Sequence, residues 1–346
     1  MSFLKSVTKM ATKHQNDLDK DFVKGLYWAG IPTFFKCEQS SEPTKCDIAL
    51  VGVPHSTGNG TTLRDQHLGP RAVRDISGLG RRVHLDFNLN PWQCCRIFDF
   101  GDVPLPEGNN NEASIKHITN YFVTLDRAET RTVAIGGDHS ITGGILRAMG
   151  GKASKLSQGE PVALLHIDAH TDTFLHLEHF LGARQSAAHW GAQLVKEGHI
   201  NANASTQIGI RGNPRSLDWY EPSIELGYKL ITKQDYDTLG EAVCCRVIRE
   251  RIADKPVYIT FDLDSLDASI APGVANLEPG IPGFNMQQAV GLLRSVRGLN
   301  IIGGDVVCLM PTADNPNKVT AMVAMNIMFE ILALITDYLQ SQRNEL

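Results

Sequence analysis

The sequence predicts an α/β fold in which a central, mostly parallel β-sheet is covered by helices on both faces. Short runs of apolar and β-branched residues recur along the 346-residue chain, with helix-like segments between them. Parallel strands need such crossover segments, and strands that are buried on both faces are apolar throughout. Each run also ends in polar or glycine-rich residues, and α/β proteins bind ligands at the carboxyl ends of strands.

The expected elements follow in order along the chain. The runs with the composition of buried strands are Asp47–Val53, Thr132–Ile135, Val162–Ile167, Gln207–Ile210, Val257–Phe261 and Ile301–Val307. Apolar residues at helical spacing predict helices at Ile115–Leu125, Gly240–Ile252 and Met286–Val296. Val319–Leu339 is long and apolar on more than one face, which predicts a C-terminal helix packed into the body.

The domain organisation is expected to be simple. Residues 1–42 lack a strong pattern and are predicted to form an N-terminal arm that touches the body or a neighbouring subunit. At about 150 residues per domain, the length is compatible with two domains. We find no internal repeat, low-complexity tract or Pro/Gly-rich linker, so we expect residues 43–346 to form one domain. The composition, 42% hydrophobic and 21% charged, argues against intrinsic disorder.

Composition also argues against several function classes. The formal net charge is -5, so we expect no basic face and no nucleic-acid partner. No stretch approaches the roughly 20 consecutive apolar residues of a membrane helix, and the first residues lack the apolar run of a signal peptide. The cysteines number seven, with adjacent pairs at Cys94–Cys95 and Cys244–Cys245, and they predict neither a disulfide framework nor a Cys-x-x-Cys site. They are typical of reduced thiols, so we expect a cytoplasmic protein.

Clusters of His and Asp follow three of the predicted strands. The clusters are GGDHS at 136–140, HIDAHTD at 166–172 and DLDSLD at 262–267. Asp168, His170 and Asp172 are two residues apart, and a strand sends such residues to the same side. Asp262 and Asp264 repeat this spacing.

Together with His139, these residues gather two imidazoles and four carboxylates. So much negative charge needs cations to offset it, which predicts a pair of divalent metal ions. The carboxylate-rich, thiol-free set favours Mn²⁺, with Ni²⁺, Co²⁺ and Zn²⁺ as competitors. A single Asp-x-His is equally compatible with a helix cap or a salt bridge, but three clusters directly after strands favour metal binding.

The runs GGDHS, HIDAHTD and TFDLDSLD, in this order, resemble the arginase/agmatinase (ureohydrolase) family, and its agmatinase-like branch most closely. GVPHSTGNG, LGPRAVRDIS, IGIRG, IAPGVANLEPG and PTADNPNKVTA support the resemblance, which runs from about Cys46 to Leu339. It implies a three-layer arginase-like fold and an oligomer of the trimer or hexamer type. The implied ligands are His139, Asp168, Asp172 and Asp262 for one metal, and His170, Asp168, Asp262 and Asp264 for the other, with Asp168 and Asp262 bridging.

The resemblance also implies a mechanism. A hydroxide between the two metals attacks the carbon of a guanidine-type group, and Asp172 orients it by accepting a hydrogen bond. The departing nitrogen needs a proton donor. The candidate is His189, because the family has a His-Gly motif at this helix and this chain reads His189-Trp190. His176 and His179 are rivals for this role. His166, Asp138 and Asp267 are expected to orient the ligands.

One position departs from the family pattern. The family strand corresponding to Ile301–Val307 ends in Asp-x-x-Glu, whose Glu holds the substrate guanidinium, but here Cys308 follows Asp305 at that spacing. A cation beside two metals then lacks an offsetting carboxylate. Cys308 and Met310 are instead expected to give the substrate pocket a polarisable apolar wall that suits N-methyl groups. Trp190 is expected to stack on a planar substrate.

The preferred substrate from sequence is therefore an N-substituted guanidine or a biguanide. Metformin hydrolases of this family release dimethylamine and guanylurea, and they use nickel and a homologous second subunit, so Ni²⁺ or Mn²⁺ and such a subunit are expected. The alternatives are an agmatinase or guanidino-acid hydrolase that releases urea, and a non-catalytic paralogue subunit. A two-metal phosphoesterase would need a cation to clamp phosphate, and Arg211 is the candidate.

Overall fold

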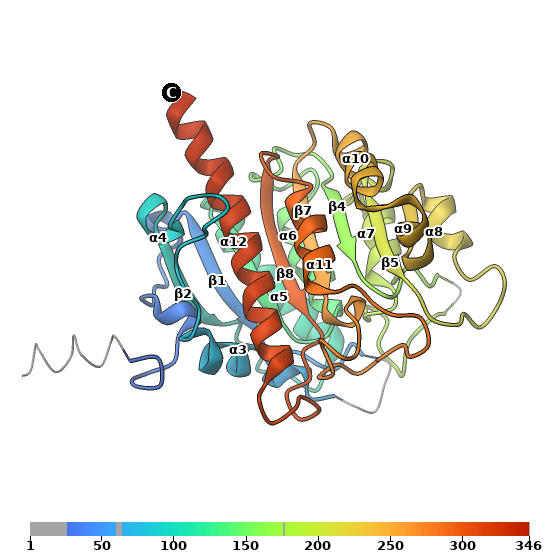
Figure 1. Ribbon diagram of the computed structural model, residues 1–346, viewed down its shortest axis with the longest axis horizontal. Helices are drawn as coiled ribbons and strands as arrows, with labels where there is room; N and C mark the ends of the chain where they lie inside the picture. Colours follow the sequence, from blue (N-terminus) through green and yellow to red (C-terminus); the bar gives the residue numbers. More distant parts are fainter. Residues whose placement is uncertain (1–25, 60–63, 176, 346) are drawn as a thin grey trace, which may run out of the picture.

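Eight strands form one parallel sheet at the centre of the computed structural model, which describes residues 26–59, 64–175 and 177–345 (Figure 1). The strand order is β2-β1-β3-β8-β7-β4-β5-β6. The strands are β1 Ile48–Val53, β2 Ile97–Asp102, β3 Arg131–Gly136, β4 Ala163–Ile167, β5 Thr206–Ile210, β6 Lys229–Thr232, β7 Val257–Asp262 and β8 Ile301–Val307. This architecture confirms the predicted α/β fold class.

The two strands that sequence reasoning missed, β2 and β6, are the edges of the sheet. An edge strand has one neighbour, so its residues need not all be apolar. In β2, the sequence IFDFGD alternates buried and half-buried residues and includes Asp99 and Gly101. β6 has four residues and begins at the exposed Lys229. The remaining strands lie within about two residues of their predicted ends, as boundary predictions usually do.

Helices cover both faces of the sheet, and the alternation of side chains along each strand divides the core in two. Ile48 and Leu50 of β1 pack into one cluster, while Ala49 and Val51 pack into the other. α3, α9, α10, α11 and α12 cover the first face, and α5, α6 and α7 cover the second (Figure 1). The helices are α3 Gly69–Ser77, α4 Pro91–Cys94, α5 Asn111–Arg127, α6 Ser140–Met149, α7 Trp190–Glu197, α8 Glu221–Leu226, α9 Lys233–Leu239, α10 Glu241–Ile252, α11 Met286–Arg294 and α12 Val319–Glu345.

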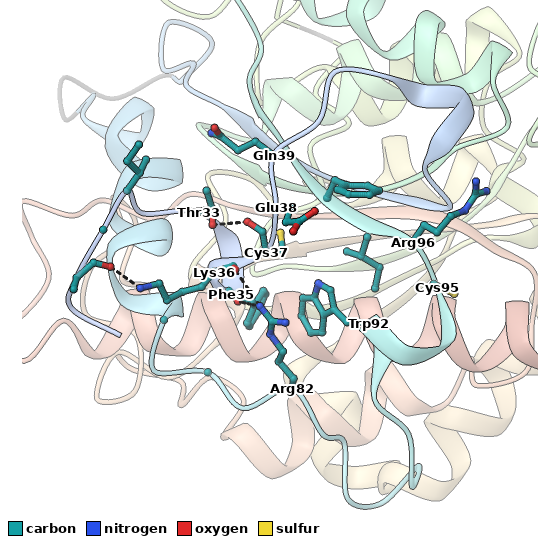
Figure 2. A pocket seen from close by; sticks show the side chains of 17 residues that line it. Thr33, Phe35, Lys36, Cys37, Glu38, Gln39, Arg82, Trp92, Cys95 and Arg96 are labelled. Carbon is teal, nitrogen blue, oxygen red and sulfur yellow. Dashed lines mark hydrogen bonds between the residues drawn. The ribbon is translucent and has the colours of Figure 1, made fainter. Parts of the chain in front are cut away.

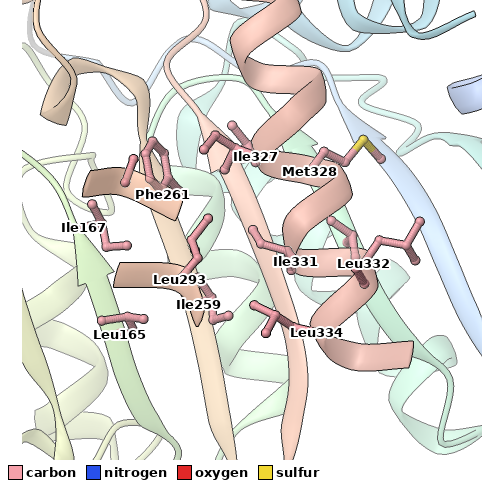
Figure 3. Packing of buried hydrophobic residues seen from close by; sticks show 14 of the residues in the cluster. Leu165, Ile167, Ile259, Phe261, Leu293, Ile327, Met328, Ile331, Leu332 and Leu334 are labelled. Carbon is pink, nitrogen blue, oxygen red and sulfur yellow. The ribbon is translucent and has the colours of Figure 1, made fainter. Parts of the chain in front are cut away.

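The C-terminal helix α12 is the apolar centre of one face. Figure 3 shows Ile327, Ile331 and Leu334 of α12 beside Ile259 and Phe261 of β7. By length and hydropathy α12 could cross a membrane, but 78% of its most apolar window is buried inside the fold. Each buried Ile or Leu contributes about 1.5–3 kcal/mol. Packing against the sheet therefore accounts for the composition of this helix.

The described end of the N-terminal segment packs on the body at the β2 edge. Phe34 is buried, and its backbone N–H donates to Asp99 of β2 at 2.9 Å. A cavity of about 970 Å³ lies between this segment and β2, where Arg82 stacks on Trp92 at 4.8 Å (Figure 2). Residues 1–25 of the predicted arm lie outside the described residues, so the division at residue 42 stays a prediction.

Candidate metal centre

The predicted ligands meet at one edge of the sheet. β3, β4 and β7 are parallel members of one sheet, so their carboxyl ends lie on the same edge. His139 follows β3, and Asp168, His170 and Asp172 follow β4. Asp262 ends β7, and Asp264 lies in the 3₁₀ turn Leu263–Ser265 that follows it. The structure thus brings all six predicted ligands together.

Two groups of side chains share Asp168. Nδ1 of His139 lies 2.9 Å from Oδ2 of Asp168, 3.0 Å from Oδ2 of Asp172 and 3.2 Å from Oδ2 of Asp262. Nδ1 of His170 lies 3.2 Å from Oδ2 of Asp264 and 3.5 Å from Oδ1 of Asp168. Asp168 therefore presents one oxygen to each histidine, as a bridging ligand would.

A chain of hydrogen bonds sets the tautomer of His139. Thr260 donates its hydroxyl proton to Oδ1 of Asp305 at 2.6 Å, so its oxygen accepts from Nε2 of His139 at 2.8 Å. Asp305 also accepts from the hydroxyls of Thr142 and Tyr258. The proton of a neutral His139 is thus held on Nε2, and Nδ1 carries the lone pair that faces the carboxylates.

A carboxylate sets the tautomer of His170 in the same way. Nε2 of His170 donates to Oε1 of Glu278 at 3.0 Å, which leaves Nδ1 for a cation. Sequence reasoning missed this role of Glu278, although it lies in the IAPGVANLEPG segment. Arg211 holds this loop by donating to the backbone carbonyls of Asp264, Leu266 and Leu277. Its guanidinium is therefore engaged, which leaves the phosphoesterase alternative without its proposed clamp.

The pKa shifts in the cluster reflect an excess of carboxylates, which bound cations would offset. Burial lowers the pKa of His139, but the three carboxylates around it raise that pKa by more, to well above the usual value. Burial, followed by the charge of Asp262, raises the pKa of Asp264 well above its usual range. Among the described residues, no group meets hydrogen-bond geometry at the buried Nδ1 of His139. An imidazole nitrogen surrounded by three carboxylate oxygens is a suitable set of ligands for a divalent metal ion.

Two further side chains hold the carboxylates in place. Nδ1 of His166 accepts from Gln207 at 3.1 Å, so Nε2 donates to Oδ2 of Asp168 at 2.8 Å, in agreement with the expected orienting role. The indole N–H of Trp190 donates to Oδ2 of Asp172 at 2.9 Å. Trp190 is 1% exposed, with its ring against His139, so the expectation that it stacks on the substrate is wrong in this conformation.

Two other expected orienting residues bind backbone instead of ligands. Asp138 accepts from the N–H groups of Gly58 and Ser140. Asp267 accepts from the N–H groups of Ser269 and Gly283. They shape the loops around the centre, and within the described part of the chain neither forms a side-chain hydrogen bond with a predicted ligand.

The structure leaves the proton donor as a prediction. His189 is the residue before α7, is buried, and has its Nδ1 2.8 Å from the hydroxyl of Ser186. His179 is exposed, and its Nδ1 accepts from the N–H of Gly182. Neither residue lines the cavity over the ligands. His176 lies outside the described residues.

A small cavity of about 40 Å³ lies over the ligands, and Cys308 is one of its walls. Cys308 follows β8 with a φ of 69°. Burial, followed by the charges of Asp262 and Asp264, raises the pKa of its thiol well above the usual value, so the wall is uncharged. Met310 is buried, and its N–H donates to the carbonyl of Gly273. It is not among the residues that line this cavity, contrary to the expectation from sequence.

A larger cavity of about 320 Å³ adjoins the first, and Asn59, His170 and Asn276 line both. Most of its walls come from the loops that follow β4 and β5, and the segments after β1 and β7 contribute Asn59, Asn276 and Glu278. The aromatic side chains among them are Phe174, Phe180, Trp219 and Tyr220.

Several known proteins are similar to this chain in sequence and in structure. The sequence profile of the arginase family matches residues 46–334. The chain is 32% identical to the guanidinopropionase of Pseudomonas aeruginosa, over 95% of this chain and 98% of the relative. It is also 32% identical to the mitochondrial guanidino acid hydrolase of Homo sapiens, over 88% and 83% of the two chains. Among solved structures, the proclavaminate amidino hydrolase of Streptomyces clavuligerus has a TM-score of 0.79 at 30% identity, covering 90% of this chain and 99% of that one.

Proposed function

This chain belongs to the arginase family, a family of hydrolases with a dinuclear metal site, and we propose that it hydrolyses a carbon–nitrogen bond of a guanidino compound at two divalent metal ions. The observation that carries the proposal is the position of Asp168, whose two oxygens face the Nδ1 atoms of His139 and His170. Thr260 and Glu278 accept from Nε2 of these two histidines, so each neutral ring carries its proton on Nε2 and leaves Nδ1 free for a metal ion. This arrangement has the ligand types and orientation that a two-metal site needs.

The chemistry follows from the side chains around that site. His139, Asp168, His170, Asp172, Asp262 and Asp264 would hold two divalent ions, which would lower the pKa of a water molecule and so supply a nucleophile at neutral pH. Asp172, oriented by Trp190, has an oxygen on the same side and would accept a hydrogen bond from that water. Water adds to the guanidino carbon, a carbon–nitrogen bond breaks, and the departing nitrogen takes a proton, for which His189 is the proposed donor.

The names of the relatives favour a guanidino acid or agmatine as substrate. A guanidinopropionase, a guanidino acid hydrolase and an agmatinase of Gallus gallus are each at least 30% identical to this chain. With such a substrate, the products are urea and a primary amine. This supports the urea-releasing alternative better than the sequence-based preference for a biguanide.

A second candidate substrate rests on Cys308. Its uncharged thiol lines the cavity beside Asp262 and Asp264. A neutral wall offers the N–H groups of a guanidinium no counter-charge, whereas N-methyl groups need none. On this observation we keep an N-substituted guanidine or a biguanide such as metformin as the second candidate. Nickel, a trimeric or hexameric assembly and a homologous second subunit belong to the same proposal.

A substrate panel tests the function directly. Agmatine, arginine, 3-guanidinopropionate, 4-guanidinobutyrate and metformin are incubated with protein loaded with Mn²⁺ or with Ni²⁺, and urea, guanylurea and amines are quantified. We expect metal-dependent release from at least one guanidino compound. The matched control is Asp168→Asn, which keeps the size of the bridging side chain and removes its charge. Equal release by the control, or no release by the metal-loaded enzyme from any compound, contradicts the proposal.

A further inference from the structure

The aromatic cavity beside the ligands is built from segments far apart in sequence. Phe174 comes from the loop after β4, and Trp219 from the loop after β5; their ring centroids are 4.7 Å apart. Leu177 and Phe180 extend the first wall, and Tyr220 extends the second. At about 320 Å³, the cavity is within the range of small-molecule sites.

The cavity opens directly onto the candidate metal centre. The two cavities share His170, Asn59 and Asn276 as lining residues. A molecule whose guanidino carbon lies over the ligands must therefore place its other end among the aromatic rings. The small cavity alone, about 40 Å³, holds little more than the reacting group.

The charged groups around the aromatic cavity disfavour a second charge on the substrate. Glu278 accepts from His170, and its negative charge is offset by the nearby guanidinium of Arg211, which itself donates to backbone carbonyls. The remaining cation among the described lining residues is Arg215, which is exposed. An exposed arginine repels an ammonium group and binds a carboxylate weakly, because surface ion pairs are largely offset by solvent.

We propose that the cavity of Phe174, Phe180, Trp219 and Tyr220 binds the non-reacting substituent of the substrate and selects an uncharged, apolar one. Aromatic faces bind alkyl groups and planar groups by dispersion and loss of hydrated surface. The exposed Leu175, Leu181 and Leu217 on the same loops continue this apolar character. The inference rests on the proposed function, since it takes the cluster of His and Asp as the place of reaction. It favours the second candidate substrate, an N-substituted guanidine, over a guanidino acid or agmatine.

Three ligands with the same reacting group separate the possibilities. Butylguanidine, 4-guanidinobutyrate and agmatine end in a methyl, a carboxylate and an ammonium group. Binding to the Mn²⁺-loaded protein is measured by calorimetry, and urea release is measured in parallel. We expect butylguanidine to bind about 10-fold or more tightly than either charged analogue, the discrimination that a small apolar group gives in such a pocket.

Matched variants assign the selection to its residues. Trp219→Leu should reduce the preference for butylguanidine several-fold, mainly through KM, with metal content unchanged. Arg215→Gln, on the same loop, should leave the preference in place. Tighter binding of 4-guanidinobutyrate by the native protein, lost in Arg215→Gln, would overturn the inference and assign the cavity to guanidino acids. Because binding is measured separately, an absence of urea release with the expected binding order contradicts only the proposed function.

Discussion

Replacing Thr260 by Val tests whether an outer hydrogen bond prepares His139 for a metal ion. The substitution removes the oxygen that accepts the Nε2 proton at 2.8 Å. The ring is then more stable with its proton on Nδ1, facing Asp168 and Asp172. A metal ion must displace that proton and leave a buried Nε2–H without an acceptor, at a cost of about 1–3 kcal/mol. The expected loss of metal affinity is about 10- to 100-fold.

Competition with a chelator measures this loss, with Mn²⁺ titrated into metal-free protein at constant pH. Tyr258→Phe is the matched control, because it removes a hydroxyl donor to Asp305 at 2.8 Å but leaves the contact between Thr260 and His139. Thermal unfolding of the metal-free variants establishes that both fold. An unchanged affinity in Thr260→Val, or an equal loss in Tyr258→Phe, would refute the reasoning.

Three further substitutions test the remaining roles. Asp168→Ala should abolish loading of both metals, because one carboxylate faces both histidines; full occupancy by elemental analysis would show that the ligands are misassigned. His189→Ala should lower kcat by about 10²- to 10⁴-fold at unchanged metal content. The control is His179→Ala, at an exposed residue. If kcat fell in this control and stayed near the wild-type value in His189→Ala, the role of proton donor would be assigned to His179. Cys308→Glu should raise kcat/KM for agmatine relative to metformin, since a buried carboxylate favours N–H donors over N-methyl groups; an unchanged ratio contradicts a substrate-facing Cys308.

The cluster of candidate metal ligands was predictable because its pattern is local. Asp168, His170 and Asp172 alternate at the end of one strand, and the period of two already places them on one side. The strands that carry them are central and apolar, so they were recognisable. The edge strand β2 was not, because Asp99 within it accepts hydrogen bonds from Arg74 in place of apolar contacts.

The supporting contacts were not predictable, because they join distant positions. Thr260 and Asp305 lie on neighbouring strands, and only their register brings the hydroxyl between Asp305 and His139. A buried Asp inside the apolar run IIGGDVV was the available signal. Trp190 was assigned to the substrate because sequence does not show which side of α7 its ring occupies. The ring instead points inward, to Asp172.

The two parts of the site stand on different kinds of structure. The candidate ligands follow central strands, whose backbones are hydrogen-bonded to a neighbouring strand on each side. The aromatic residues of the cavity belong to the loops after β4 and β5. Loops tolerate substitution and length change far better than buried strands do. During evolution, residues of the aromatic cavity can therefore be exchanged one at a time, which changes the substrate, while the candidate metal ligands are kept. Such descent would yield relatives that share a reaction but differ in what they consume.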